Sequence, residues 1–208
     1  MRVLSNAQIR EVENETARSG PGFAGMMADA GHACAEHIVS EYPDAYRIVF
    51  LCGSGRNGGD AYACACDGLL GSRSISLIRL SRKPYDEVSS FFRAKALKKS
   101  NCTELFFDRD ETARLLAESD LIADAVFGIG FRGVLSGDEL DAVRLANSSG
   151  KPVFAIDVPS GVGENATGAE KVRADSTLTM IAVKRSMTEK PASRACGNVF
   201  VAHIGETS

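Results

Sequence analysis

The sequence predicts an α/β protein with three αβα layers, in which a mostly parallel, Rossmann-like sheet follows two N-terminal helices. Two observations predict this class. Apolar runs of strand length recur along the chain, and segments with a helical pattern separate them; this alternation is typical of βαβ units and parallel sheets. The 208 residues, of which 44% are hydrophobic, fit one buried core. We therefore expect a single domain over residues 1–208.

The N-terminal part predicts two helices, over residues 5–18 and 23–40, with a Ser-Gly-Pro-Gly break at 19–22. Ser5 and Asn6 are suited to cap the first of them, because their short polar side chains accept hydrogen bonds from free helix N–H groups. Both helices lie outside the βα alternation, and we expect them to offer the face of a homodimer.

Apolar runs predict the strands. Residues 46–52 (YRIVFLC) are almost continuously apolar, as expected of a central strand that is buried on both faces. The other predicted strands cover residues 73–80, 103–107, 120–126, 152–158, 176–182 and 198–203. The predicted helices between them cover residues 60–70, 85–99, 110–118 and 138–147.

Charge and cysteine content exclude several classes of function. The net charge is −3 and there is no Lys/Arg tract, so a nucleic-acid or membrane-surface partner is not expected. No apolar stretch is long enough to span a bilayer, and the polar N-terminus does not resemble a signal peptide. The six cysteines form no CxxC pair, and we expect reduced structural thiols in a cytoplasmic protein. His32 and His37 are expected to be structural or surface residues.

Open parallel sheets bind ligands at the carboxyl ends of their strands, so the loops after strands are the places to look for a site. The first, residues 53–60, has four glycines and would let a ligand approach both its backbone and the N–H groups of the next helix. It matches neither the G-x-G-x-x-G fingerprint nor a P-loop. Asn57 and Asp60 add polar groups, although a tight turn with Asp60 as an N-cap is the simpler interpretation.

Two further loops carry acidic residues. Asp124 lies inside an apolar strand, where a carboxylate needs a cation or several hydrogen-bond donors, and glycines follow at 128, 130 and 133. Asp157 ends another buried strand and is followed by Pro159, Ser160 and Gly161, a pattern that also suits an Asx-type turn. Because the strand ends converge, carboxylates and glycine loops without Cys or His favour a hard, oxygen-liganded cation beside a bound ligand.

The three loops, in this order, resemble those of the NAD(P)HX epimerase family, also called the YjeF N-terminal domain. That family carries G-P-G-N-N-G-G-D-G, D-A-x-F-G-x-G and D-x-P-S-G motifs. This chain has G-S-G-R-N-G-G-D-A at 53–61, D-A-V-F-G-I-G at 124–130 and D-V-P-S-G at 157–161. M-x-x-A-G at 27–31 and A-D-S-T-L-T at 174–179, with Lys184, are also similar to family motifs. The resemblance thus covers nearly the whole chain.

The resemblance implies an epimerase, that is, an isomerase that interconverts the R and S forms of NADHX and NADPHX, which are NADH and NADPH hydrated at C6 of the nicotinamide ring. It implies K⁺ as a cofactor, with Asn57, Asp124 and Ser160 as side-chain ligands. It implies that the substrate contacts Arg56, Asn57, Gly58, Gly59, Asp60, Gly128, Ile129, Gly130, Phe131, Arg132, Gly133, Val134 and Asp157. The family is often fused to a dehydratase domain, for which this chain has no room, so we expect a separate dehydratase to act on the product.

The chemistry predicts catalytic roles for Asp60 and Asp157. The reacting C6 carries a hydroxyl beside a ring nitrogen, so we expect hydroxide to leave with a donated proton and to add again from the opposite face. Arg56 stands where the family has Asn, and it could contact a phosphate or a carboxylate, or it could crowd the site. The alternatives are a non-catalytic nucleotide-binding or protein-interaction module of the same fold and an ordinary NAD(P)-dependent oxidoreductase. The latter is disfavoured because the second predicted strand does not end in an acidic residue.

Overall fold

The computed structural model describes residues 2–205 and contains a seven-stranded sheet with the order β11-β9-β7-β5-β2-β3-β4. All of its neighbouring strands are parallel. The strands are β2 (Arg47–Cys52), β3 (Ser74–Arg79), β4 (Cys102–Phe106), β5 (Leu121–Ala125), β7 (Val153–Ile156), β9 (Ser176–Met180) and β11 (Asn198–Ala202). Strand order runs outward in both directions from the β2–β5 pair, so the switch point of this doubly wound sheet lies there.

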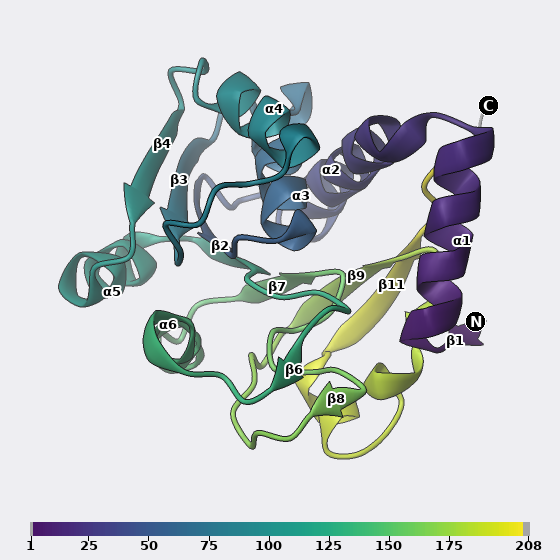
Figure 1. Cartoon of the computed structure of the whole chain (residues 1–208). Coiled ribbons are helices and arrows are strands. Elements are labelled where there is room, and N and C mark those ends of the chain that lie inside the picture. The colour runs from purple at the N-terminus through teal and green to yellow at the C-terminus, as the bar shows by residue number, and fades with distance from the viewer. Residues whose placement is uncertain (1, 206–208) are drawn as a thin grey trace.

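Helices cover both faces of the sheet, which confirms the predicted three-layer α/β class (Figure 1). The helices are α2 (Gly22–Glu41), α3 (Arg56–Ala65) and α4 (Glu87–Ala96) on one face, and α5 (Arg109–Glu118) and α6 (Gly137–Ser148) on the other. Successive residues of β2 point to opposite faces: Phe50 packs into the core under α2–α4, and Leu51 into the core under α5 and α6. Both side chains are fully buried, as the continuous apolar run predicted.

The N-terminal segment is fixed across the carboxyl ends of the strands. β1 (Val3–Leu4) pairs with β10 (Val183–Lys184), just beyond β9. α1 (Asn6–Ser19) then begins with a capping box between Ser5 and Gln8, which confirms Ser5 as its N-cap. The Asn6 side chain donates a hydrogen bond to the carbonyl oxygen of Ile129, 2.9 Å away. This bond ties the start of α1 to the loop after β5.

Most predicted elements agree with the structure to within three residues, but α3 is a clear exception. It begins at Arg56 instead of Asp60 and ends at Ala65, and a separate 3-10 turn, η1 (Gly68–Leu70), follows it. The predicted glycine loop is therefore partly the first turn of a helix. Gly59 packs so closely against Ser89 and Met27 that no side chain would fit there. This packing outweighs the low helix propensity of glycine.

The remaining elements are short and were not predicted. β6 (Arg132–Gly133) pairs with β8 (Asn165–Ala166) in a small separate sheet. Two further 3-10 turns, η2 (Arg185–Met187) and η3 (Ala192–Ala195), precede β11. Segments of two to four residues carry no periodicity that a sequence pattern could reveal.

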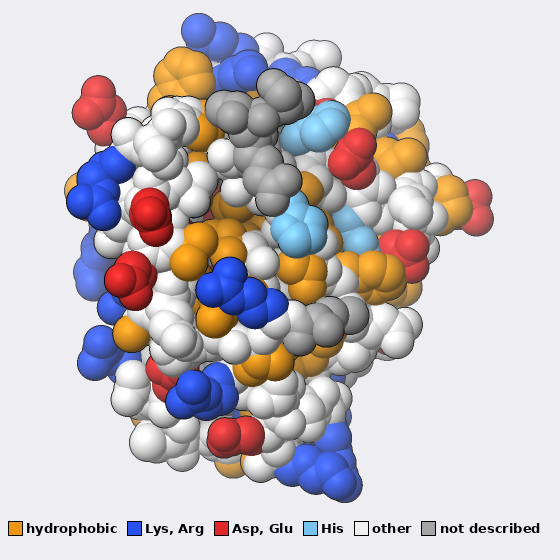
Figure 2. All heavy atoms as spheres, turned by 90° about the vertical axis from the view of Figure 1, so that its right-hand side faces the viewer, with side chains coloured by type: hydrophobic (Ala, Val, Ile, Leu, Met, Phe, Trp, Pro, Cys, Tyr) orange, Lys and Arg blue, Asp and Glu red, His pale blue; other side chains and the backbone are white. Residues whose placement is uncertain are grey.

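The cysteines and histidines agree with their predicted structural roles. All six cysteines are free thiols. His37 is buried and hydrogen-bonded to Ser176, whereas the more exposed His32 contacts Asp67. No helix within residues 2–205 is both long and apolar enough to cross a membrane. On the face shown in Figure 2, acidic and basic side chains are interspersed.

Candidate functional site

The loops after β2, β5 and β7 border a cavity of about 680 Å³ at the carboxyl edge of the sheet. The cavity lies beside the switch point, and its volume falls within the range of about 300–1,000 Å³ that is usual for small-molecule sites. α1 and the start of α2 form its opposite wall. Its lining residues are Arg10, Glu13, Asn14, Phe23, Met26, Met27, Ala30, Ser54, Gly55, Arg56, Asn57, Asp60, Asp86, Glu87, Val88, Val126, Phe127, Gly128, Ile129, Gly130, Phe131, Asp157, Met180 and Ile204.

The glycine loop brings the N-terminus of α3 to this cavity. A side chain at Gly53 would overlap the carbonyl oxygen of Val126, so only glycine lets the loops after β2 and β5 meet this closely. The N-cap of α3 is Gly55, which supplies no capping side chain. The first N–H groups of the helix are therefore available to an anionic ligand, which the positive end of the helix dipole also favours.

Asn57 is buried without hydrogen-bond partners. Its side chain is only 8% exposed, and neither its amide oxygen nor its amide nitrogen has a partner among the described residues. Leaving a buried polar group unpaired costs roughly 1–3 kcal/mol, so such groups are rare unless a ligand, ion or water satisfies them. Asn57 lines the cavity and lies close to Gly128 of the next loop.

Asp124 and Ser160 form one rigid polar unit beneath the loops. Both are fully buried, and the Ser160 hydroxyl donates to Asp124 Oδ1 over 2.6 Å, while the backbone N–H of Ser160 donates to Oδ2 over 2.7 Å. The Ser160 hydroxyl also accepts from the N–H of Phe127 over 2.9 Å. Burial raises the pKa of Asp124 to about 6, and the hydrogen bonds from Ser160 partly oppose that rise.

Asp157 is held by a buried lysine. It has a φ of 68°, a left-handed conformation that non-glycine residues rarely adopt. Its Oδ1 accepts a hydrogen bond from the ammonium group of Lys184, which is only 1% exposed. The ammonium also donates to Thr179 Oγ1 over 2.7 Å and to the carbonyl oxygen of Met180 over 2.9 Å. A lysine with all three donors used in this way fixes the carboxylate in place.

Two more carboxyl groups reach the same cavity. Burial raises the pKa of Asp60 well above its usual range, and the nearby charges of Asp157 and Glu13 raise it further. The pKa of Glu13, on α1, is also raised, first by burial and then by Asp157. These groups hold their protons to higher pH than exposed carboxyls do, so the cavity can contain a protonated acid beside an ionised carboxylate.

The structure brings most of the predicted site residues together. Those that line the cavity are Arg56, Asn57, Asp60, Gly128, Ile129, Gly130, Phe131 and Asp157. A Cβ at Gly128 would contact both Asp157 and Asn57, which shows how closely the three loops converge. The predicted site residues outside the lining are Gly58 and Gly59, which pack inside the protein, Arg132, Gly133 and Val134 in or next to β6, and the buried Asp124 and Ser160. Their contacts with a ligand or an ion stay predictions.

The donors fit a hard cation. Asp124 is a buried carboxylate that has no ion pair with a described residue, and Asn57 offers an amide oxygen that lacks a partner. Within residues 2–205 no three His, Cys, Asp or Glu side chains cluster as a metal site. Neutral Asn and Ser oxygens, with a single carboxylate, suit a weakly charged hard cation better than a transition metal.

Sequence reasoning missed Glu13 and assigned no site role to Lys184. Lys184 had a signal, because it is the one charged residue between Met180 and Arg185. Glu13 had none, because on a polar helix only the docking of α1 determines which acidic residue faces the cavity.

Fold and site together define an α/β protein with an acid-lined ligand cavity at the switch point of a parallel sheet. The family model for the YjeF-related protein N-terminus matches residues 24–186. The chain therefore belongs to this family. The match to this family begins at residue 24, after the end of α1, so Glu13 lies outside the matched region.

Relatives and a solved structure agree with this assignment. The chain is 31% identical over 180 residues to the NAD(P)H-hydrate epimerase of Limosilactobacillus fermentum, covering 85% of this chain and 84% of that protein. It is 29% identical over 202 residues to the NAD(P)H-hydrate epimerase of Rhodopirellula baltica, covering 95% and 82%. The bifunctional NAD(P)H-hydrate repair enzyme Nnr of Coxiella burnetii is 29% identical over 205 residues, covering 98% of this chain but only 41% of that protein. The crystal structure of yeast ynu0 superposes with a TM-score of 0.79 at 18% identity, over 98% of this chain and 87% of that one, and shows the shared fold.

Proposed function

We propose that this protein is an isomerase of nucleotide repair, which interconverts the R and S forms of hydrated NADH and NADPH. The family assignment and the relatives named NAD(P)H-hydrate epimerase support this activity. The observation that carries the proposal is the meeting of Asp60 with the Asp157–Lys184 pair at one wall of the cavity, beside the free N-terminus of α3.

The two aspartates are suited to different tasks. The raised pKa of Asp60 favours its protonated form, which can donate a proton to a leaving hydroxyl. Asp157 forms an ion pair with the buried ammonium group of Lys184. One protonated and one ionised carboxyl group in the same cavity are what an acid-assisted departure and a cationic intermediate require.

In the proposed reaction, the C6–O bond breaks and Asp60 gives its proton to the departing oxygen, which leaves as water. The lone pair of the adjacent ring nitrogen then delocalises into the ring and leaves a cation, which the carboxylate of Asp157 stabilises. Water adds to the opposite face of C6, and its extra proton returns to Asp60. Atoms and charge balance, and only the configuration at C6 changes.

We further propose K⁺ as the cofactor, with Asn57, Asp124 and Ser160 as its side-chain ligands. The unpaired amide oxygen of Asn57 and the buried carboxylate of Asp124 support this choice of residues. When bound, the ion would supply positive charge that offsets the buried carboxylate and holds the three loops together. Asn57 would fix the start of α3, which carries Asp60, and Ser160 would fix the loop that carries Asp157.

The remaining parts of the proposal concern partners and location. We propose a homodimer, with the two N-terminal helices α1 and α2, which lie outside the βα alternation, as its face. The relatives named bifunctional repair enzymes support a dehydratase that acts on the product. The free cysteines are consistent with a reducing cytoplasm.

The direct test is conversion of one purified epimer of NADHX or NADPHX into the other, followed by chromatography. We expect catalysed equilibration in K⁺ buffer and slower equilibration when tetramethylammonium replaces K⁺. A non-catalytic binding module would bind the nucleotide without changing the spontaneous rate. Hydride transfer from unmodified NADH or NADPH would instead identify an oxidoreductase.

A further inference from the structure

The loop between β3 and α4 runs from the end of the second strand to the wall of the cavity. At its start, the Leu80 N–H donates to the carbonyl oxygen of Cys52 over 3.0 Å. Near its end, the Tyr85 hydroxyl donates to the carbonyl oxygen of Gly53 over 2.7 Å, and Asp86 lines the cavity. Residues 80–86 therefore lie alongside the glycine loop, next to the free N-terminus of α3.

Internal hydrogen bonds preorganise this loop. The backbone N–H of Lys83 donates to Ser81 Oγ over 3.2 Å. The Arg79 guanidinium donates to the carbonyl oxygen of Lys83 over 2.9 Å and stacks near the ring of Tyr85. Because the backbone is held at both ends and in the middle, the side chains of Arg82 and Lys83 project from a fixed position.

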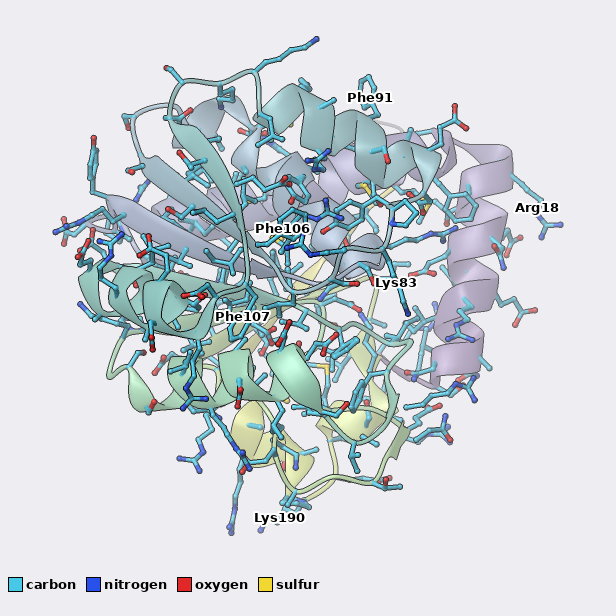
Figure 3. All side chains as sticks on the ribbon, turned by 60° about the vertical axis from the view of Figure 1, so that its left-hand side comes forward. Arg18, Lys83, Phe91, Phe106, Phe107 and Lys190 are labelled. Carbon is cyan, nitrogen blue, oxygen red and sulfur yellow. The ribbon has the colours of Figure 1, made fainter. Side chains whose placement is uncertain are left out.

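The loop carries positive charge that no described carboxylate neutralises. Arg82 and Lys83 are exposed and have no ion pair within residues 2–205. The Arg82 guanidinium lies over the ring of Phe106, 4.2 Å from its centroid, and in Figure 3 Lys83 and Phe106 occupy the same side of the molecule. Arg79 lies on β3 directly before the loop and is buried, with a guanidinium Nε that has no described partner.

Three of the nearby acidic groups, Glu104, Asp108 and Asp86, are already engaged. Glu104 is held by two hydrogen bonds of 2.6 Å from Arg93. Asp108, which follows β4, caps α5 through the N–H of Glu111. On the loop itself Asp86 lies 3.8 Å from Arg56, and the neighbouring Glu87 lines the cavity. Arg79, Arg82 and Lys83 thus leave a local excess of positive charge beside the site.

In doubly wound dinucleotide sites, the diphosphate lies at the first helix N-terminus and the adenosine ribose reaches the end of the second strand. A carboxylate there binds the two hydroxyls of NADH, whereas basic side chains accept the 2′-phosphate of NADPH. Here that strand is β3, and the residues that follow it are Leu80, Ser81, Arg82 and Lys83.

We infer that the loop between β3 and α4 is a subsite for the 2′-phosphate, formed by Arg82 and Lys83 over Arg79, and that the protein prefers NADPHX to NADHX. The inference rests on the proposed function for the position of the nicotinamide end. Arg82 and Lys83 are specificity-determining residues, because they contact the phosphate and not the reacting carbon.

The test compares the Arg82→Ala/Lys83→Ala double variant with the wild type on both substrates. Loss of two charge-assisted contacts should raise the KM for NADPHX by roughly 10-fold or more and leave that for NADHX within about 3-fold. The wild-type preference for NADPHX should fall accordingly. Lys190→Ala removes one exposed positive charge on the distant turn labelled in Figure 3 and should leave the preference unchanged.

Binding measurements separate this inference from the proposed activity. By calorimetry, 2′,5′-ADP should bind the wild type roughly 10-fold more tightly than AMP, and the double variant should lose that difference. If the wild type epimerises neither substrate but keeps this difference, the proposed function fails and the subsite stands. Equal binding of the two probes by the wild type, or equal loss of both substrates in the double variant, would overturn the subsite.

Discussion

Replacing Asp60 with Asn separates catalysis from stability. In the wild type this carboxyl group lies beside Asp157 and Glu13, and burial and both neighbours raise its pKa. Asn has nearly the same shape but neither donates an acidic proton nor carries a charge. Because Asp60 is proposed to protonate the leaving hydroxyl, we expect Asp60→Asn to slow epimerisation by roughly 10²-fold or more.

The stability of the same variant should change in the opposite direction. The folded-state pKa of Asp60 is raised above its unfolded value of about 3.9. Its contribution is therefore fully present below that pH and is lost as the pH rises towards the folded-state pKa. In that window the wild type should lose up to about 1.4 kcal/mol of unfolding free energy per pH unit through this one group, and Asn removes that loss. Exposure to water in the cavity reduces the figure.

Both effects can be measured on one preparation. Epimerisation is followed by chromatography, and urea unfolding is recorded at about pH 5 and about pH 7. We expect Asp60→Asn to be slow at both pH values and to gain stability over the wild type between them. Asp110→Asn, an exposed position on α5, is the matched control and should change neither property. A near-wild-type rate in Asp60→Asn, or a stability curve parallel to that of the wild type, would refute the reasoning.

Three further predictions concern the rest of the site. Asp157→Asn leaves the Lys184 ammonium buried without its partner, so it should destabilise the protein by about 3–5 kcal/mol and slow epimerisation. Adding Lys184→Met should restore stability but not activity. Failure of that rescue in urea unfolding would contradict the ion-pair role. K⁺ must compete with a proton on Asp124, whose pKa is raised to about 6. The K⁺ concentration for half-maximal activity should therefore rise up to about 10-fold per pH unit below about pH 6 and stay level above it. A flat pH profile would exclude Asp124 as a ligand. Gly53→Ala should separate two loops and destabilise the protein by roughly 1–3 kcal/mol or more in thermal unfolding, whereas Gly68→Ala, with open space around it, should be nearly neutral.

The sheet was predictable because its central strands are buried on both faces. β2, β5 and β7 have no exposed side apart from one end residue, so their sequences are nearly all apolar and stand out from the helices between them. The start of α3 was not predictable, because glycines at 58 and 59 are normally a sign of a loop. A Cβ at Gly59 would overlap Met27 and Ser89, which explains why glycine stands within this helix.

The convergence of the three loops was also predictable, since parallel strands end at the same edge of a sheet. The hydrogen bonds between Asp124 and Ser160 and the contacts around Gly128 confirm that convergence. Glu13 and Lys184 were harder: Glu13 lines the cavity through the docking of α1, and Lys184, on the strand β10 that pairs with β1, contacts Asp157. Those contacts involve elements of two residues and a polar helix, and neither leaves a periodic pattern in the sequence.

The central claim is that one hydrated nucleotide lies between the N-terminus of α3 and the wall formed by Asp60 and Asp157. A crystal structure with bound NADPHX in K⁺ buffer tests it most directly. We predict the diphosphate on the N–H groups of α3 and the C6 hydroxyl of the nicotinamide ring within hydrogen-bonding reach of both aspartates, directly or through one water. A nucleotide bound outside the cavity, or with its nicotinamide ring turned away from Asp60 and Asp157, would contradict the account.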